Sequence, residues 1–585
     1  MTVFPNPRSF TMPRPLLGGW TILVLTIAAM IAAPILVVLS AVFVNSGDTW
    51  QHLVATVLPT YITNSLLLMV GVGGGVTLIG VGTAWLITLC RFPGRWLFEW
   101  ALLLPLAAPA YLLAYVYTDI LDFYGPVQTK LREIFGWQTV QDYWFPNVRS
   151  LWGAIAMLTL VLYPYVYLLA RSAFLSQSIC MLEVSRSLGC SPWRSFFTIA
   201  LPLGRPAITA GLSLALMETL NDYGTVQYFG VDTFTTGIYR TWFGMGDRPA
   251  ATQLAALLTL FALVLILLER WSRGQAKYYQ TANAVQPLST YQLHRVRAIA
   301  AMVACSLPIL LGFLVPAGVL LQMTLAMPSA ASEVESADDY ASNDFAASGF
   351  GDSRAADAFW SFASNSFTLA AVTALVAVLL AVILAYGLRL QPTRGIRLAT
   401  QVSAIGYAVP GSVIAVGVLL PIGNLDNAID AWMRSSFGIS TGLLLSGTIA
   451  ALVFAYLVRF LAVSFGSVDA SLSSIKPNLD DAARSLGHSS ISTLARVHAP
   501  LMWSGVLTAA MLVFVDVMKE LPATLIVRPF NFDTLAVRVY NLASDERLAE
   551  AAAPALAIVL VGLLPVILLS WKLTHSRTNR EQPLG

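Results

Sequence analysis

The chain has 585 residues, of which 57% are hydrophobic and only 11% are charged. A soluble protein of this length would need a more charged surface, and the long apolar runs are typical of a polytopic helical membrane protein. The formal net charge of +3 gives no indication of a nucleic-acid partner, and the four cysteines show neither metal-site spacing nor a pattern of pairs.

Twelve segments of about 20 apolar residues or more are predicted to cross a lipid bilayer. They lie near 18–44, 62–89, 97–120, 150–174, 205–229, 250–270, 297–326, 362–388, 400–421, 439–464, 503–527 and 551–572. Arginine and lysine follow the even-numbered segments, so the positive-inside rule places both chain ends in the cytoplasm. The acidic stretch 329–357 falls on the opposite side and is predicted to be a flexible outer loop.

Two halves of the sequence repeat each other. Asn64-Ser65 recurs as Asn365-Ser366, 301 residues later, and "EVSRSLGCSPWRSFFTIALP" recurs 298 residues later as "DAARSLGHSSISTLARVHAP". Each half therefore contains six predicted spans, with a first half at 1–290 and a second at 291–585. Because six is even, both halves have the same orientation in the membrane. The expected fold is an all-α polytopic membrane protein of about 12 transmembrane helices.

The repeated stretch is a loop between the fourth and fifth spans of each half, at about 180–205 and 476–503. In both copies a glycine, Gly189 or Gly487, suits the left-handed position that ends a short helix. A serine two residues later, Ser191 or Ser489, can cap the next helix. An amphipathic hairpin on the membrane surface is the plainer alternative, but recurrence at the same place in both halves makes it the lesser interpretation.

These loops resemble the EAA motif of ABC-importer permeases. The first copy departs from the motif because Val184-Ser185 replace its two alanines, and the second departs because Ala499 replaces a leucine. The resemblance implies that each loop is a coupling helix that docks on a separate cytoplasmic ATPase. The residues that carry this role by resemblance are Glu183, Ser187, Gly189, Pro202, Asp481, Ala482, Ala483, Gly487 and Pro500.

The whole chain resembles the fused ferric-iron permease type, through "METLNDYGTVQYFGV" and "DVMKELPATLIVRPFNFDTLAVRVYNLASDERLAEAA". The resemblance implies a type I ABC-importer permease fold in a bacterial inner membrane. It implies a cytoplasmic ABC ATPase dimer and a periplasmic or surface ferric-iron-binding protein as partners. The chain has no G-x-x-x-x-G-K-[ST] phosphate loop, so no enzymatic activity or bound cofactor is expected, with ATP and magnesium on the ATPase.

Two pairs of acids interrupt the apolar runs. Glu218 and Asp222 in the fifth span correspond to Asp516 and Glu520 in the eleventh. A spacing of four residues predicts that each pair shares one helix face. Four unpaired charges facing lipid would cost on the order of 10 kcal/mol. The acids are therefore expected to be paired, protonated or exposed to a water-filled cavity.

Asp222 and Glu520 are expected to line the translocation path, where carboxylates can contact iron transiently without forming a stable metal site. Glu218 and Asp516, one turn nearer the cytoplasm, are expected to be paired or protonated as readily as exposed to the path. Lys519 adjoins Glu520 in the sequence and is the nearest candidate counter-charge.

Several other polar residues have plainer interpretations. Tyr111, Tyr115, Tyr117 and Tyr124 are predicted to form an aromatic belt at the outer end of the third span, with an entrance for iron as the alternative. His498 is predicted to be solvated in the cytoplasmic loop.

Two rival functions stay open. A proton-coupled secondary transporter could also have twelve spans in parallel halves, with the acids as proton carriers. An ABC importer could instead carry thiamine, a phosphonate or a polyamine.

Overall fold

The computed structural model describes residues 19–43, 47–176, 191–273, 291–334 and 353–581. Ten helices in these ranges are long and apolar enough to cross a membrane, or up to 12 if each of two bent helix pairs counts as one span. The predicted all-α polytopic fold is therefore confirmed. In the described part of the chain the β-structure consists of two short parallel strands, β1 (Cys90–Arg91) and β2 (Tyr291–Gln292).

The first half of the chain forms α1 (Gly19–Ser40), η1 (Ala41–Phe43), α2 (Gly47–Thr56), α3 (Leu58–Leu89), α4 (Arg95–Ala101), η2 (Leu104–Ala107), α5 (Ala110–Leu121), α6 (Pro126–Phe135), α7 (Leu151–Ser176), α9 (Pro192–Ser195), η3 (Phe196–Ala200), α10 (Leu201–Asn221), α11 (Gly224–Tyr228), α12 (Phe234–Tyr239), η4 (Arg240–Gly244) and α13 (Arg248–Arg273).

The second half forms α14 (Val296–Ile309), η5 (Leu310–Leu314), α15 (Val315–Val334), α16 (Ser353–Leu390), α17 (Arg394–Ser403), η6 (Ile405–Ala408), α18 (Gly411–Phe437), α19 (Ile449–Ser473), α20 (Asn478–Ser485), α21 (Ser490–Thr493), η7 (Leu494–His498), α22 (Ala499–Leu501), α23 (Trp503–Met518), α24 (Pro522–Val527), α25 (Leu535–Ser544) and α26 (Leu548–Glu581).

The sequence repeat is also a repeat of contacts. The Asn64 side-chain amide donates to the carbonyl oxygen of Asp232 at 2.9 Å, and Asn365 donates to the carbonyl oxygen of Asp533 at 3.1 Å. A π-helical turn occupies the same place in each half, as η3 before α10 and as η7 before α22 and α23. The two halves therefore share one architecture, whereas the boundary near residue 290 stays a prediction.

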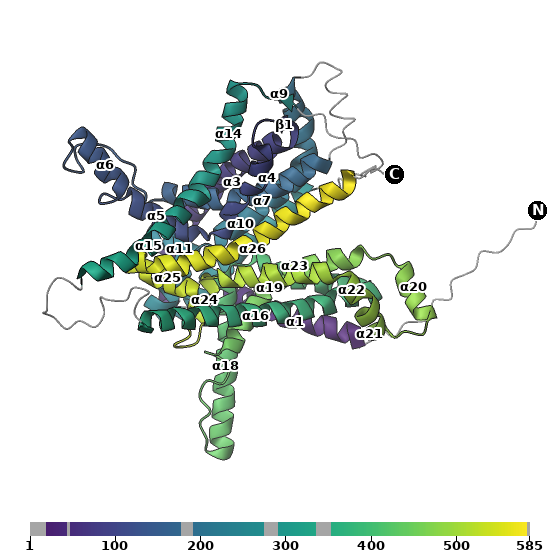
Figure 1. Cartoon of the computed structure of the whole chain (residues 1–585). Helices are drawn as coiled ribbons and strands as arrows, with labels where there is room; N and C mark the ends of the chain where they lie inside the picture. Colours follow the sequence, from purple (N-terminus) through teal and green to yellow (C-terminus); the bar gives the residue numbers. More distant parts are fainter. Residues whose placement is uncertain (1–18, 44–46, 177–190, 274–290, 335–352, 582–585) are drawn as a thin grey trace, which may run out of the picture.

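The first helix of each half packs across onto the other half. Figure 1 shows α1 (purple) beside α16 of the second half, where the Trp20 ring meets the Tyr386 ring edge-on at 5.3 Å. Conversely, η5 between α14 and α15 packs against first-half helices, and its Leu311 carbonyl accepts a hydrogen bond from the Tyr117 hydroxyl at 2.6 Å. The halves are therefore intertwined, although each is continuous in sequence.

Several predicted spans are broken or shifted. The segments predicted at 97–120 and 400–421 are each interrupted at a proline, Pro109 or Pro410, which is the N-cap of the next helix, α5 or α18. Proline lacks a backbone N–H and disfavours helical geometry in the preceding residue, so a continuous helix is wrong there. The segments predicted at 205–229 and 503–527 stop early, at Asn221 and Met518. The predicted span 439–464 begins only at Ile449.

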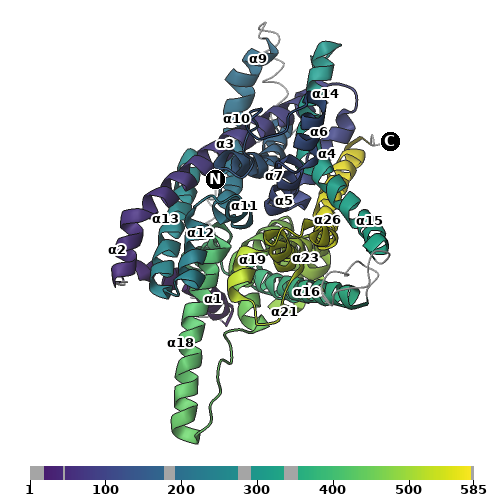
Figure 2. The ribbon, with the colours of Figure 1, turned by 90° about the vertical axis from the view of Figure 1, so that its left-hand side faces the viewer.

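Helix α18 extends far from the rest of the molecule, as Figure 1 and Figure 2 show. Two acids of α18 bind the segment that leads back from its far end to α19. Asp426 accepts a hydrogen bond from the Ser446 backbone N–H at 2.7 Å, and Asp430 accepts one from the Thr441 N–H at 2.8 Å. These bonds satisfy backbone donors that the return segment would otherwise leave unpaired.

Candidate functional site

A cavity of about 100 Å³ lies where the two halves meet. Its walls come from α5, α7 and α10 of the first half and from α19, α23 and α24 of the second. All four acids singled out in the sequence line it, namely Glu218, Asp222, Asp516 and Glu520, together with Arg459 and Lys519. The structure thus brings the repeated acids into one site, while their contact with cargo stays a prediction.

In the first half, the acids lie on either side of a helix end. Helix α10 ends at Asn221, and Asp222 has an extended backbone with ψ of 130°. Its carboxylate accepts hydrogen bonds from the backbone N–H groups of Thr225 and Val226, both at 3.1 Å, and from the Thr225 hydroxyl at 2.9 Å. Asp222 therefore caps α11. The prediction that Glu218 and Asp222 share one face of one helix is wrong.

The second half repeats this break. Helix α23 ends at Met518, and Glu520 lies in the short connection before α24. One Glu520 oxygen accepts a hydrogen bond from the backbone N–H of Ala523 at 3.2 Å. Asp222 and Glu520 therefore play the same part in the two halves: each accepts hydrogen bonds from backbone N–H groups at the start of the next helix. Asp516 and Glu520 do not share a continuous helix face either.

Arg459 is the central counter-charge, and the sequence reasoning missed it. Its Nη1 lies 2.8 Å from Glu520 Oε1 and 3.0 Å from the side-chain oxygen of Asn221, and its Nη2 lies 3.4 Å from Glu218 Oε2. The signal was available, because Arg459 is a lone basic residue inside the apolar run 439–464. Isolated charges in such a run mark functional or paired positions.

Lys519 pairs with Asp516. It does not pair with its sequence neighbour Glu520, for which the sequence had suggested it as the counter-charge. The Lys519 ammonium lies 3.0 Å from Asp516 Oδ1. The side chains of Glu218 and Asp516 are 22% and 19% exposed, whereas that of Glu520 is only 5% exposed. Glu218 and Asp516 are thus paired yet partly exposed, whereas Glu520 is buried against Arg459.

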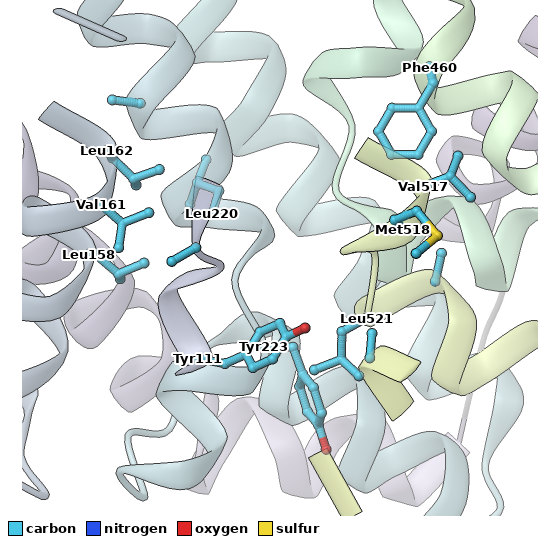
Figure 3. Packing of buried hydrophobic residues seen from close by; sticks show 14 of the residues in the cluster. Tyr111, Leu158, Val161, Leu162, Leu220, Tyr223, Phe460, Val517, Met518 and Leu521 are labelled. Atoms are coloured by element: carbon cyan, nitrogen blue, oxygen red, sulfur yellow. The ribbon is translucent and has the colours of Figure 1, made fainter. Parts of the chain in front are cut away.

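Aromatic and apolar side chains close the cavity at one end. Figure 3 shows Tyr111 and Tyr223 meeting Leu521 between the wall of Leu158, Val161 and Leu162 and the opposite wall of Phe460, Val517 and Met518. The Tyr223 hydroxyl lies 3.2 Å from the Tyr540 hydroxyl, which joins the halves. Since Tyr223 and Leu521 follow the ends of α10 and α23, this closure lies at the end farther from the coupling loops.

The predicted aromatic belt is wrong for three of its four members. Tyr111, Tyr115 and Tyr117 are buried, because α5 lies inside the helix assembly, and only Tyr124 is exposed. The Tyr111 hydroxyl lines the cavity and has no hydrogen-bond partner among the described residues.

The coupling loop of the second half has the predicted shape. Helix α20 ends before Gly487, whose φ is +80°. The Gly487 N–H bonds to the Arg484 carbonyl at 2.9 Å, and the His488 N–H bonds to the Ala483 carbonyl at 3.0 Å. This pair of bonds is the Schellman motif that a glycine in the left-handed region permits. Ser489 then caps α21, since its side chain accepts from the Ser492 N–H at 3.3 Å.

The other residues predicted to contact an ATPase lie as follows. Asp481 is exposed on α20 and lies 3.7 Å from Arg484, Ala482 is exposed beside it, Ala483 is buried, and Pro500 is in α22. In the first copy Pro202 is near the start of α10, whereas Glu183, Ser187 and Gly189 lie outside the described residues.

A polar cluster fastens this loop to α16. Arg389 donates from Nε and Nη2 to Asp480 at 2.9 and 2.7 Å, and its Nη1 donates to the Leu472 carbonyl at 2.5 Å. The other oxygen of Asp480 lies 2.8 Å from His498 Nε2. His498 is fully buried, so the prediction that it is solvated is wrong. The loop is held by contacts that the local sequence pattern does not reveal.

Comparisons with known proteins agree with this geometry. Residues 76–274 match the family described as the binding-protein-dependent transport system inner membrane component. The Fe(3+)-transport system permease protein FbpB 2 of Haemophilus influenzae is 27% identical over 95% of this chain and 99% of its own length. The ferric transport system permease protein FbpB of Actinobacillus pleuropneumoniae is 22% identical over 89% of this chain and 72% of its own length.

Another group of relatives matches only part of the chain. The molybdenum transport system permease protein ModB of Escherichia coli is 27% identical over 33% of this chain and 83% of its own length. Two fused halves therefore distinguish this chain from the shorter relatives. In its apolar helices, its family match and its full-length likeness to FbpB 2, the chain is similar to multi-pass inner-membrane components of binding-protein-dependent transport systems.

Proposed function

We propose that this permease translocates ferric iron through the cavity between its halves. The observation that carries the proposal is the set of four carboxylates, two from each half, that line one space. Against them stand two basic side chains, Arg459 and Lys519, so the ionised site has a formal charge of −2. Ferric iron is a hard cation that favours oxygen ligands, and acids lining a path favour cations.

The comparisons support a cationic cargo over an oxyanion. Three relatives that match 88–95% of the chain are named for Fe(3+) or ferric transport, and a fourth that matches 87% is named only as a probable ABC transporter permease. The relatives named for molybdenum match about a third of the chain. A molybdate/tungstate permease of Thermococcus kodakarensis matches 42% of the chain. An oxyanion would be repelled by a site of negative charge.

The energy source in this proposal is a separate cytoplasmic ATPase dimer, and a periplasmic ferric-iron-binding protein delivers the cargo. The exposed Asp481 on α20 and the fixed turn at Gly487 form a rigid projecting element that suits docking on one ATPase subunit. The first-half loop would engage the other subunit. Both chain ends are then cytoplasmic, as the distribution of basic residues predicts.

Uptake of radioactive iron tests the proposal. The chain is produced with its cognate ATPase and binding protein in a host that lacks its own ferric importer. We expect iron uptake that requires all three components and stops when ATP is depleted. Persistence of uptake without ATP, with collapse when the proton gradient is abolished, would instead establish a proton-coupled transporter.

Labelled spermidine serves as the competing cargo, because a polyamine would also suit an acidic cavity. Uptake of spermidine without uptake of iron in the same cells would replace iron by a polyamine and leave the ABC mechanism in place. Thiamine and an alkylphosphonate are the further probes, and neither is expected to be taken up.

A further inference from the structure

The positive charge of Arg459 belongs to one half only. The acids of the cavity are repeated, with Glu218 matching Asp516 and Asp222 matching Glu520 at an offset of 298 residues. Helices α7 and α19 begin at the same offset, so the position of Arg459 corresponds to Val161. Both side chains line the cavity and are buried. Both halves therefore contribute acids to the cavity at equivalent positions, whereas only the second half contributes a guanidinium at the position of Arg459.

The guanidinium joins the two halves. On its own half it binds Glu520, with Nη1 at 2.8 and 2.9 Å from the two carboxylate oxygens. On the first half it contacts Asn221 at 3.0 Å and Glu218 at 3.4 Å. The Asn221 oxygen also accepts the backbone N–H of Gly411 at 2.6 Å, which is a second link between the halves. One side chain thus neutralises acids from both sides of the cavity.

The chain around this contact is built to fit it. A β-carbon on Gly411 would lie 2.6 Å from a Glu520 oxygen and 2.7 Å from Arg459 Nη1, so a larger residue at the start of α18 would displace the ion pair. Lys519, the other base of the cavity, pairs within its own half at an i, i+3 spacing. Arg459 is therefore the base that competes with an entering cation for acids of both halves.

We propose that Arg459 is a specificity-determining residue, a tethered cation that occupies the cavity acids until a cation of higher charge displaces it. The inference rests on the proposed function, because its cargo is a hard trivalent cation. A monovalent ion offers the carboxylates no more charge than the guanidinium already does, whereas a trivalent ion offers three charges. Displacement removes the Arg459 contacts between the halves, so entry of cargo loosens the interface.

The guanidinium also contacts an aromatic ring while it is paired with the acids. Its carbon already lies 5.2 Å from the centre of the Phe460 ring, and an aromatic face attracts a cation at such a distance. The exchange needs no proton transfer. It also explains how an acidic path releases its cargo, since the returning guanidinium competes with the ion for the same oxygens.

Terbium luminescence tests the proposal. Tb³⁺ is a hard trivalent cation whose emission is sensitised by nearby aromatic rings, and Tyr111 and Tyr223 line the cavity. The full chain in lipid nanodiscs is titrated with Tb³⁺. We expect Arg459→Met to lower the apparent Kd about tenfold, because the tethered competitor is gone. In the complete importer, the same change should slow iron uptake while raising apparent affinity.

Lys519→Met is the matched control, since it removes the same charge from the same cavity but breaks no contact between halves. Its effect on the Tb³⁺ Kd should be about threefold or less. Equal effects of the two variants on the Tb³⁺ Kd would show that Arg459 acts only through its contribution to the net charge, and would overturn the proposal. Unchanged or weaker Tb³⁺ binding in Arg459→Met would also overturn it.

Arg459→Lys is the alternative test variant if Arg459→Met fails to insert into the membrane. A lysine keeps the charge but cannot reach Glu520, Asn221 and Glu218 together, so Tb³⁺ should bind about threefold more tightly than to wild type. An unchanged Kd in this variant would overturn the proposal. Absence of iron uptake by the wild-type importer would instead contradict the proposed function, whatever the Tb³⁺ titrations show.

Discussion

At the scale of single residues, Asp222 can act through its hydrogen bonds or through its charge. Its carboxylate caps α11, and an asparagine at that place can still accept from Thr225 and Val226. We expect Asp222→Asn to retain most iron uptake. Asp222→Ala removes the cap and should lower the free energy of unfolding by about 1 kcal/mol. Thermal unfolding and iron uptake are measured on the same preparations.

The outcome for Asp222 separates its two roles. If Asn abolishes uptake as fully as Ala does, while unfolding stays at the wild-type temperature, then the charge is needed on the path and the cap is secondary. Thr225→Val provides a comparison, because it removes one hydroxyl donor to the same carboxylate and leaves the charge.

Glu218 and Asp516 are both partly exposed in the cavity, at 22% and 19%. Replacing either by its amide keeps the shape and removes one negative charge. We expect Glu218→Gln and Asp516→Asn each to slow iron uptake, and the double change to reduce it about tenfold or more. Stimulation of the ATPase by the loaded binding protein should fall less, because the coupling loops are distant from the cavity.

The control for these acids is Glu550→Gln. Glu550 pairs with Arg547 at 2.6 Å near the start of α26, outside the cavity lining. Uptake by this variant should stay near wild type. Normal iron uptake by the double variant, Glu218→Gln and Asp516→Asn, would show that neither acid is needed on the translocation path.

At the scale of elements, the turn at Gly487 depends on backbone conformation alone. Its φ is +80°, and no described atom lies within 4 Å of the place a β-carbon would occupy. A β-branched residue is disfavoured in this region by about 1–2 kcal/mol, whereas asparagine tolerates it. We expect Gly487→Val to weaken co-purification of the ATPase while membrane insertion persists. Wild-type recovery of the ATPase with Gly487→Val would contradict this, and Gly487→Asn is the matched control.

The attachment of the same loop to α16 makes a separate prediction. Arg389 holds Asp480 with two donors of a planar fork, which a lysine cannot reproduce. We expect Arg389→Lys to leave ATPase binding intact but to lower the iron transported per ATP hydrolysed about threefold. Arg397→Lys on the exposed side of α17 is the control. An unchanged ratio of iron transported to ATP hydrolysed in Arg389→Lys would show that the contact between Arg389 and Asp480 holds the loop in place but does not affect coupling.

The repeat made the acids and the coupling loop predictable, because each feature appears twice. The break in each fifth span was less visible, since Tyr223 and Leu521 continue an apolar pattern and the capping bonds of Asp222 depend on tertiary structure. Arg459 was missed because its repeat partner is Val161. Asp480 was missed because its partner, Arg389, lies 91 residues away in the sequence, and the burial of His498 against Asp480 depends on the same tertiary contact. Residues that act in one half alone escape an argument based on symmetry.

At the scale of the whole molecule, the intertwined first helices limit how the halves can move. Helix α1 packs on α16–α18, and η5 packs on first-half helices, so neither half can separate from the other without carrying a helix of its partner. A rigid-body rocking about the cavity is compatible with this arrangement, whereas complete separation is not. The contacts that open and close are then those at the ends of the cavity.

The aromatic closure of the cavity supplies the last prediction. Tyr223 of the first half and Tyr540 of the second meet through their hydroxyls at 3.2 Å, and the Tyr239 hydroxyl donates to the Pro522 carbonyl beside them. We infer that these contacts seal the outer end of the path and must part for cargo to enter. The test is a Tyr223→Cys and Tyr540→Cys pair in a chain whose four native cysteines are serines.

A reducible bifunctional thiol reagent should link this pair and stop iron uptake, and reduction should restore it. A spacer is needed because side chains that meet at the hydroxyls of two tyrosines start from Cα atoms farther apart than the roughly 7 Å that a direct disulfide tolerates. ATP hydrolysis should continue in the linked protein, since the link lies at the end of the cavity away from the coupling loops. The Tyr223→Cys single variant controls for the reagent. Undiminished uptake by fully linked protein would show that the two tyrosines do not separate during transport, and the path would then have to open elsewhere along the interface between the halves.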